Sequence, residues 1–577
     1  MLTDTKRSRN AKVTPVDGLS VTWTKGLWKE RTDTCAQATV PQLQHMFESK
    51  EISHVLENFR ICAGESEGDF DGTVFGDGDF YKWMEAAIYT AAKNNDEKML
   101  EQIDAYIELI KKAQLPDGYL STKQIIGERS QNGVTRMGDI NDFEVYNFGH
   151  LFTAACLHKR LTGKDSFLKI AVKTADYLEG MYADALEKGE VQTAVCPSHY
   201  MGLVEMYRTT GEERYLKLAE QAISLRDSVK EGMDDNQDRI PLRKHEKIIG
   251  HAVRANYLYA GVADLCLEEE DEELKEVLHK VWRSLVDKKL YLTGGCGALY
   301  NGTSPYGNFF VDQKVHQAYG YEYQLPNITA YNETCASLGG VFWAYRMFQM
   351  EPEAEYFDVL ERMMLNTNLA ALSMDGKRFF YENMLRRTKT LDYELIWPRT
   401  RSEYILSYCC PPNLARTIAQ SSEYAYLTSK DALWVGMYGA SRAEITLENG
   451  AVFTVHQETE YPYDGKITFT FETANRTGFS MMLRIPGWAD NGRIQTGGKQ
   501  IVLTRENAGS YYEIRIEDPQ HTEICLELEM PVRYTVANTM VEETAGQAAV
   551  ERGPLVYCCE TADVSVESLD DLYLDPE

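Results

Sequence analysis

A repeated pair of helices constrains the fold of this 577-residue chain more than any other feature. Apolar residues recur with helical spacing in pairs of segments joined by turns such as 161–164 and 209–212. Six such units begin near Lys82, His150, His199, His251, Glu333 and Asn413. Each opens with a helix of small and apolar residues and closes with a charged amphipathic one. No polar capping repeat is evident, so the pattern predicts a closed double ring, an (α/α)6 barrel, rather than an open solenoid.

Near Ala432 the apolar period changes to the two-residue alternation of strands, as in 443–447, 466–471 and 511–516. We therefore predict a barrel domain over 1–431, including an extended N-terminal lead-in with a short helical piece at 42–57. An antiparallel β-sandwich is predicted over 432–577. The sandwich region has no cluster of His, Cys and acidic residues, which indicates a structural role. The acidic end at 570–577 has no strand pattern, so the sandwich is expected to lack its final strands.

The amino-acid composition limits the kinds of partner that the chain can bind. With 60 Lys and Arg against 88 Asp and Glu, the net charge is −28, which disfavours binding to nucleic acid or to anionic membranes. A neutral or sugar-like substrate fits better, and a homodimer is compatible with the sequence. The first residues lack the apolar run of a signal peptide, and no later run is long enough to span a bilayer. We therefore expect a soluble, cytoplasmic protein whose 12 cysteines are reduced.

Two adjacent cysteines, Cys409 and Cys410, are followed directly by two prolines. Prolines are excluded from helix interiors, so this stretch is predicted to be a rigid loop before a helix at 414–420. Thiols beside a helix N-terminus have lowered pKa values, and the thiolate is both a nucleophile and a metal ligand. Together with Glu333 and Cys335, the pair would complete a tetrahedral zinc set. The alternatives are buried cysteines that act as small apolar residues, or a strained vicinal disulfide.

A second vicinal pair, Cys558 and Cys559, ends the apolar run 553–559. The strand-like character of that run predicts that this pair lies in the core.

Histidines open three successive inner helices, at His150, His199 and His251, with spacings of 49 and 52 residues. A single histidine on an apolar helix is usually a core residue. Here, however, later units place Glu333 and then Cys409 at equivalent ends. Because these ends converge in a toroid, the repetition predicts one shared functional funnel.

Four motifs together carry a resemblance to a known family: Glu333-Thr334-Cys335, Cys409-Cys410-Pro411-Pro412-Asn413, and the tracts 325–331 and 250–254. With them the chain resembles the β-L-arabinofuranosidases of glycoside hydrolase family 127 (the DUF1680 group) from about residue 20 to Tyr557. The resemblance implies an (α/α)6 barrel followed by β-sandwich domains. It also implies Zn²⁺ held by one Glu and three Cys, with one of these cysteines as the nucleophile.

Carried over by position, the resemblance implies the zinc ligands Glu333, Cys335, Cys409 and Cys410, with Cys409 as nucleophile. The implied sugar pocket consists of His150, His199, His251, Glu361 and Tyr381. The implied function is that of a retaining exo-glycoside hydrolase that releases L-arabinofuranose, or a related furanose, from plant-derived glycans. A lyase or isomerase would rest on the toroid alone, which does not fix function.

The chain departs from the family pattern at Gln317, which occupies the position of the general acid/base glutamate. An amide cannot donate a proton to a leaving oxygen as a carboxylic acid does. Glu322 is the nearest carboxylate along the chain and could substitute. Alternatively, an acidic branched pectin sugar of the aceric-acid type could supply its own proton. A third alternative is a non-catalytic, zinc-containing sugar-binding protein.

Overall fold

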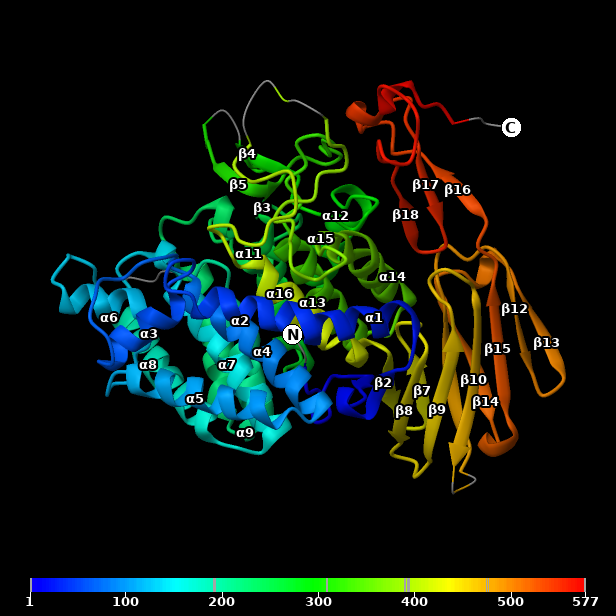
Figure 1. Ribbon diagram of the computed structural model, residues 1–577, viewed down its shortest axis with the longest axis horizontal. Coiled ribbons are helices and arrows are strands. Elements are labelled where there is room, and N and C mark those ends of the chain that lie inside the picture. Colours follow the sequence, from blue (N-terminus) through cyan, green and yellow to red (C-terminus); the bar gives the residue numbers. More distant parts are fainter. Residues whose placement is uncertain are drawn as a thin grey trace.

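The structure, a computed structural model, describes residues 3–189, 193–307, 310–388, 391, 395–473, 475 and 477–574. Helices fill the left and centre of Figure 1, and the β-sheets of the C-terminal part stand at its right. None of the described helices combines the length and the apolar character needed to cross a bilayer.

Six helices of the described chain form the inner wall of a ring. Each packs against the next, and the last packs against the first, so the ring is closed. In ring order they are α4 (Gly76–Asn94), α7 (Glu144–Thr162), α9 (Ser198–Thr210), α11 (Ala252–Glu268), α13 (Thr334–Met350) and α16 (Cys410–Ala419). The predicted (α/α)6 barrel is confirmed.

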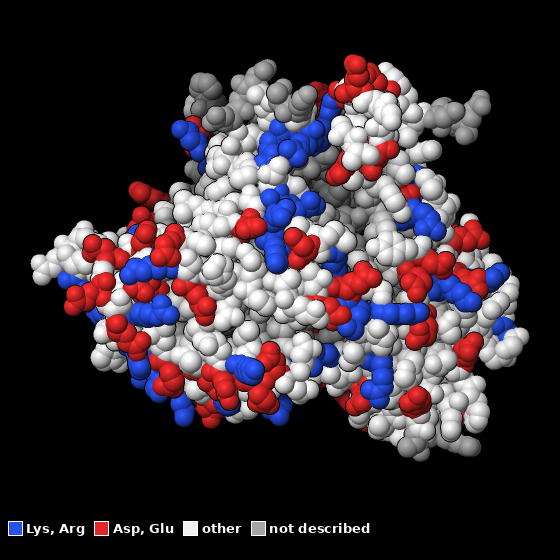
Figure 2. All heavy atoms as spheres, in the orientation of Figure 1, with Lys and Arg blue, Asp and Glu red and all other residues white. Residues whose placement is uncertain are grey.

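The helix that follows an inner helix in the chain packs outside it. These outer helices are α5 (Glu97–Ala113), α8 (Ser166–Lys188), α10 (Glu213–Ser224), α12 (Glu272–Lys288) and α14 (Ala354–Arg362). Inner α13 is buried along its whole length, whereas outer α12 buries one stripe that includes Leu274, Val277 and Leu278. The outer faces are charged, and Figure 2 shows acidic and basic side chains mixed over the visible surface.

The sixth outer position is filled from the N-terminal part of the chain. Helix α1 (Gly26–Thr34), a π-helical turn (Cys35–Thr39) and α2 (Val40–Glu48) pack against α16, and α2 also contacts α4. The predicted extended lead-in is therefore wrong here, because threonine and tryptophan weaken the helical signal. The predicted helical piece at 42–57 is interrupted, since Ser49 is extended and His54 is left-handed (φ 60°) before α3 (Val55–Ala63).

Glu57 on α3 gives the fold a pH-dependent contact. Its carboxylate accepts hydrogen bonds from Ser66 (2.6 Å) and Lys50 (2.9 Å), which lower its pKa from 4.5 to about 2. A depressed folded-state pKa stabilises the fold above pH 4.5, and this stabilisation is lost as the pH falls toward 2. We expect Glu57→Gln to lower the urea midpoint at pH 7, with the difference from the wild type shrinking below pH 4.5. A difference that does not change with pH would contradict this assignment.

Two sheets form the predicted β-sandwich (Figure 1). In the described chain the first sheet has the order β1 (Thr14–Pro15), β6 (Tyr426–Ser429), β7 (Ala432–Val435), β11 (Phe479–Ile485) and β14 (Ser510–Ile516). The second has the order β13 (Lys499–Leu503), β12 (Gly492–Thr496), β15 (Glu523–Leu528), β10 (Lys466–Thr473), β9 (Val452–Thr459), β8 (Ser441–Thr446) and β2 (Val21–Trp23). Pairing is antiparallel except between β7 and β11.

The lead-in supplies an edge strand to each of these sheets. Strand β1 pairs with β6, and β2 pairs with β8. The predicted domain boundary at 431/432 falls inside the β6–β7 hairpin. The N-terminal segment thus connects the helical ring to the sandwich.

A third sheet follows the sandwich, with strands β16 (Val532–Thr535), β17 (Ala549–Arg552) and β18 (Leu555–Tyr557). Cys558 and Cys559 come after β18 and are exposed, so their predicted core position is wrong. Their strand belongs to a small sheet and ends just before them, so the apolar run does not continue into a core. Of the predicted acidic end, residues 575–577 lie outside the described residues.

Ring and sandwich meet around a buried arginine. Arg484 of β11 donates to Glu361 (2.6 Å) and pairs with Asp358, both on α14. Tyr461 donates a hydrogen bond to the other oxygen of Glu361 (2.9 Å). Arg484 is fully buried, and its positive charge offsets the negative charges of the two carboxylates at the domain interface.

Candidate active site and metal centre

The N-terminal ends of the inner helices meet at one end of the ring. Each of the first five inner helices is followed by an outer helix that returns, so these inner helices run in the same direction. Glu333 is the N-cap of α13, and Cys409 is the N-cap of α16. Helix α16 begins at Cys410, earlier than predicted, because its prolines occupy the first turn, where no N–H bond is needed.

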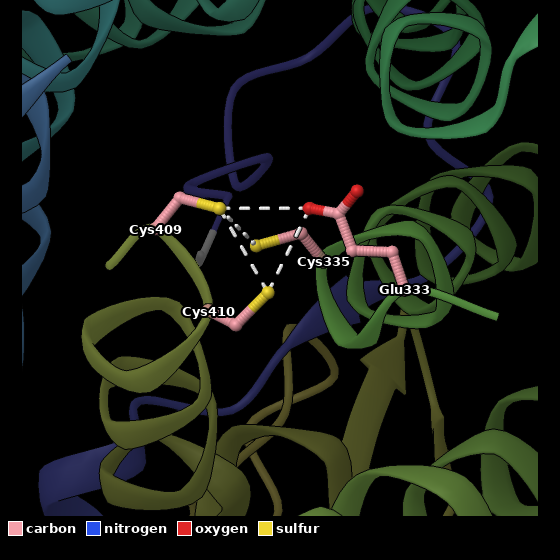
Figure 3. A group of neighbouring side chains, drawn as sticks. All are labelled: Glu333, Cys335, Cys409 and Cys410. Atoms are coloured by element: carbon pink, nitrogen blue, oxygen red, sulfur yellow. Dashed lines mark hydrogen bonds between the residues drawn. The ribbon is translucent and has the colours of Figure 1, made fainter. Parts of the chain in front are cut away.

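Four side chains converge at this end, and Figure 3 shows their ligand atoms pointing toward one another. The Sγ atom of Cys409 lies 3.7 Å from Sγ of Cys335, 3.8 Å from Sγ of Cys410 and 3.5 Å from Oε1 of Glu333. All four ligand atoms lie within 4.8 Å of one another. All 12 cysteines, which lie among the described residues, are free thiols, so the vicinal-disulfide alternative is wrong for this pair.

The geometry of this quartet fits a tetrahedral zinc ion. Thiolates bound to zinc at about 2.3 Å in a tetrahedron lie about 3.8 Å apart, close to the sulfur separations found here. The second carboxylate oxygen of Glu333 is buried and has no hydrogen-bond partner. A buried carboxylate and three clustered thiols are costly without a cation, so the donor set suits Zn²⁺.

The pKa values of the quartet show the same need for positive charge. Burial, followed by the neighbouring Cys409, raises the pKa of Glu333 well above 4.5. The contact with Cys335 raises the pKa of Cys409 to about 12. Burial raises the pKa of Cys335, but contacts with Cys409 and Cys410 outweigh it and lower the value to about 5. One negative charge is therefore favoured without a cation, and metal binding must displace the remaining protons.

A lysine that the sequence analysis named only as the start of a helical unit contacts the backbone at the nucleophile position. Lys82 of α4 is fully buried and donates to the carbonyl oxygen of Cys409 (3.0 Å) and to the Tyr146 hydroxyl (2.8 Å). It also pairs with buried Asp79 at 2.8 Å. The available signal was a lysine inside the apolar segment 80–84 of an inner helix. Its charge favours thiolate at Cys409.

A second buried network orients the thiol of Cys335. The Asn413 amide nitrogen lies 3.3 Å from Sγ of Cys335. Arg416 donates to the Asn413 amide oxygen (2.8 Å) and pairs with Glu85 (2.7 Å). Fixing the amide oxygen on the arginine turns the amide N–H groups of Asn413 toward the sulfur, which suits a thiolate.

The three repeated histidines are buried at the same end of the ring. His199 contacts the Tyr182 hydroxyl (2.9 Å), and His251 contacts Oε1 of Gln317 (2.6 Å). His150 packs edge-on against the rings of Tyr146 and Tyr257. Burial lowers the pKa of each imidazole below 6.5, so each is neutral. One ring nitrogen of each is buried and has no hydrogen-bond partner within the described structure.

Tyr381 is brought to the quartet as well. Its hydroxyl lies 3.9 Å from Sγ of Cys409, and its ring packs on Trp397 at 4.5 Å. Trp397 is a further aromatic residue here that the sequence analysis did not single out.

Two expected residues are not brought to the quartet. Both oxygens of Glu361 are used at the domain interface by Arg484 and Tyr461, so its predicted place in the sugar pocket is not supported. Glu322 pairs with Lys288 (3.0 Å) and Lys247 (3.7 Å), and the bond to Lys288 lowers its pKa. A lowered pKa is opposite to what a general acid needs, so Glu322 does not fit the role of substitute acid.

Comparisons with known proteins agree with this arrangement. The family models for the β-L-arabinofuranosidase GH127 catalytic domain, the GH127 middle domain and the family 127 C-terminal domain match residues 20–423, 432–530 and 532–577. The non-reducing end β-L-arabinofuranosidase of Bifidobacterium longum subsp. longum is 33% identical, over 94% of this chain and 87% of that protein.

Solved structures of the same family superpose closely on the chain. A protein titled glycoside hydrolase has a TM-score of 0.85 and 37% identity, over 98% of this chain and 86% of its own. A GH127 β-L-arabinofuranosidase from Geobacillus stearothermophilus T6 has a TM-score of 0.81 and 33% identity, over 93% and 86%. The resemblance drawn from the four motifs is confirmed. The chain belongs to glycoside hydrolase family 127 and is a glycoside hydrolase.

Proposed function

We propose that this protein is a retaining exo-glycosidase that releases L-arabinofuranose from plant-derived glycans, with the thiolate of Cys409 as its nucleophile. One observation supports this assignment most strongly. Cys409 is the only member of the quartet with a partly exposed side chain, while Glu333, Cys335 and Cys410 are buried. Of the four residues, Cys409 is therefore the one that a substrate can approach, whereas the other three are buried.

The reaction has two balanced steps. The Cys409 thiolate attacks the anomeric carbon, the carbon–oxygen bond to the leaving group breaks, and a general acid protonates the departing oxygen. Water, deprotonated by the same group, then attacks the anomeric carbon, and the carbon–sulfur bond breaks to restore the thiolate. Two inversions retain the configuration. Zn²⁺, when bound, would keep the three thiols ionised at neutral pH.

The groups around Cys409 suit the recognition of a sugar. Neutral His150, His199 and His251 each have a ring nitrogen without a partner, and Tyr381 presents a hydroxyl near the sulfur. Neutral imidazoles both donate and accept hydrogen bonds, as sugar hydroxyls require. Lys82 holds the backbone carbonyl of Cys409 and so fixes the nucleophile.

The test is turnover of p-nitrophenyl and disaccharide β-L-arabinofuranosides side by side. Release of arabinose from both supports the proposal and shows that the protein supplies its own acid. Cleavage of the aryl glycoside alone favours a natural substrate that brings a proton, such as an acidic pectin sugar. No cleavage of either, with zinc bound, favours a different sugar or the non-catalytic binding protein.

Removing the metal is expected to abolish turnover. Treatment with 1,10-phenanthroline should release one zinc ion per chain and stop cleavage of the aryl glycoside, and added Zn²⁺ should restore it. Extraction should be faster at pH 5.5 than at pH 8, because protons compete with the metal for the ligands. Glu333→Gln should lower zinc content, whereas Glu382→Gln, a neighbouring buried carboxylate outside the quartet, should not. Full activity in zinc-free protein would contradict the assignment.

A further inference from the structure

The residues around Gln317 are candidates for the general acid that protonates the leaving group. Gln317 lies on β5 (Lys314–Tyr319), in a small sheet with β3 (Gly250–His251) and β4 (Leu299–Thr303), and its φ of 49° is left-handed. Such a backbone is uncommon for a non-glycine residue and is concentrated at functional sites. This left-handed backbone lets the consecutive side chains of His316 and Gln317 both contact the imidazole of His251. Gln317 contacts it at 2.6 Å, and the His316 ring packs edge-on with centroids 5.1 Å apart.

His316 is paired with a carboxylate. Its Nδ1 lies 3.0 Å from Oδ1 of Asp235, in the 3₁₀ turn Asp234–Asn236. Asp235 also accepts the His316 backbone N–H (2.9 Å) and pairs with Arg254 of α11 (2.9 Å). Burial raises the pKa of Asp235, but His316 and Arg254 outweigh it and hold the value below 3.8. An ionised Asp235 fixes Nδ1 as a donor and leaves Nε2 for proton exchange, as in an Asp–His pair of hydrolases.

Backbone contacts connect the strand of this pair to the residue before Glu333. Gly297 separates Gln317 from the segment before Glu333. The Asn332 N–H donates to the Gly297 carbonyl (2.9 Å), and the Gln317 carbonyl lies 3.7 Å from a Cβ built on Gly297. The side chain of His316 is 46% exposed, so its free edge can meet a substrate.

Other histidine–carboxylate pairs in the described chain differ from this one. His279–Glu351, His456–Glu472 and His521–Asp518 lie on outer helices or on the sandwich. His158 pairs with Asp104, on α5 of the outer wall. Only the His316 pair also contacts a histidine of the repeated series.

The geometry points to His316, oriented by Asp235, as the general acid/base of the reaction in place of a carboxylate at position 317. Nε2–H of the imidazolium gives its proton to the leaving oxygen while Cys409 bonds to the anomeric carbon. The neutral imidazole then takes a proton from the water that cleaves the carbon–sulfur bond, which regenerates the imidazolium. Asp235 and His251 face the imidazole, and Arg254 faces Asp235. This role rests on the proposed function.

The test compares His316→Gln on the two β-L-arabinofuranosides. We expect kcat/KM on the disaccharide to fall by about 10²–10⁴-fold, the contribution of general acid catalysis. On the p-nitrophenyl glycoside, whose leaving group needs no proton, it should fall less than tenfold, which also verifies that the variant is folded. Asp235→Asn leaves His316 without its carboxylate partner and should lower kcat/KM more on the disaccharide than on the p-nitrophenyl glycoside. His521→Gln removes a surface His–Asp pair and should change nothing.

Several outcomes would overturn this role. Equal losses on both substrates would make His316 a support for His251 and not the acid. A disaccharide rate within twofold of the wild type would exclude His316 altogether. Wild-type protein that cleaves the aryl glycoside alone would show that the chain carries no acid. Wild-type protein that cleaves neither substrate would remove the proposed function, and the role of His316 with it.

Discussion

Cys409→Ser is expected to lower kcat/KM on p-nitrophenyl β-L-arabinofuranoside by at least about 10⁴-fold, the scale of losing a nucleophile. A serine hydroxyl is a far weaker nucleophile than a thiolate at neutral pH. The structure adds that no other thiol can replace it, because Cys335 and Cys410 are buried while Cys409 is partly exposed. The measurement is initial rate, with zinc content determined on the same sample.

The controls separate the roles of ligand and nucleophile. Cys410→Ser also removes a ligand of the quartet but leaves the exposed sulfur in place. An electrophilic arabinofuranoside should therefore label the Cys409 peptide in the wild type and in Cys410→Ser, but not in Cys409→Ser. Cys558→Ser, at an exposed thiol, should behave as wild type. A Cys409→Ser enzyme within tenfold of the wild-type rate would contradict the nucleophile assignment.

Arg484→Met is expected to lower the free energy of unfolding by about 3–5 kcal/mol, because it leaves the buried carboxylate of Glu361 and the partly exposed one of Asp358 without their counter-charge. Arg484 is fully buried and contacts both Asp358 and Glu361. Arg493→Met, in an exposed pair with Glu527, is the matched control and should cost less than about 1 kcal/mol. Chemical denaturation at pH 7 measures both.

Glu361→Gln tests which place this carboxylate occupies. If Glu361 acts at the domain interface, losing its carboxylate should lower the free energy of unfolding and leave KM unchanged. A raised KM with unchanged stability would return Glu361 to the sugar pocket that the resemblance implied. Equal stability of Arg484→Met and Arg493→Met would contradict the interface role of the arginine.

The ring and the quartet could be predicted from sequence for clear physical reasons. Helical periodicity persists over six units, and few residue types hold zinc, so adjacent cysteines with a Glu-x-Cys segment are distinctive. Strands β1 and β2 could not be predicted, because two or three residues give no alternation. The interface position of Glu361 was also hidden, since its partner Arg484 lies 123 residues later in the chain.

The burial of charged residues also could not be predicted from the sequence. Lys82, Glu85 and Arg416 occur on inner helices, where sequence patterns treat a charge as a solvent-facing residue. Their burial depends on partners from other helices, such as the pairing of Arg416 with Glu85 across the ring seam. Only the tertiary arrangement shows that Lys82 contacts the Cys409 backbone and that Arg416 reaches Cys335 through Asn413.

The closure of the ring sets an order for making the site. Helix α16 carries two of the four quartet ligands, and it packs against α4 and against the outer segment of α1 and α2, which leave the ribosome hundreds of residues earlier. The first-made part of the barrel must wait with an open flank until α16 is synthesised. Only then can the thiols of α16 join Glu333 and Cys335 on α13. Capture of a metal ion by the completed quartet would then lock the last seam of the barrel.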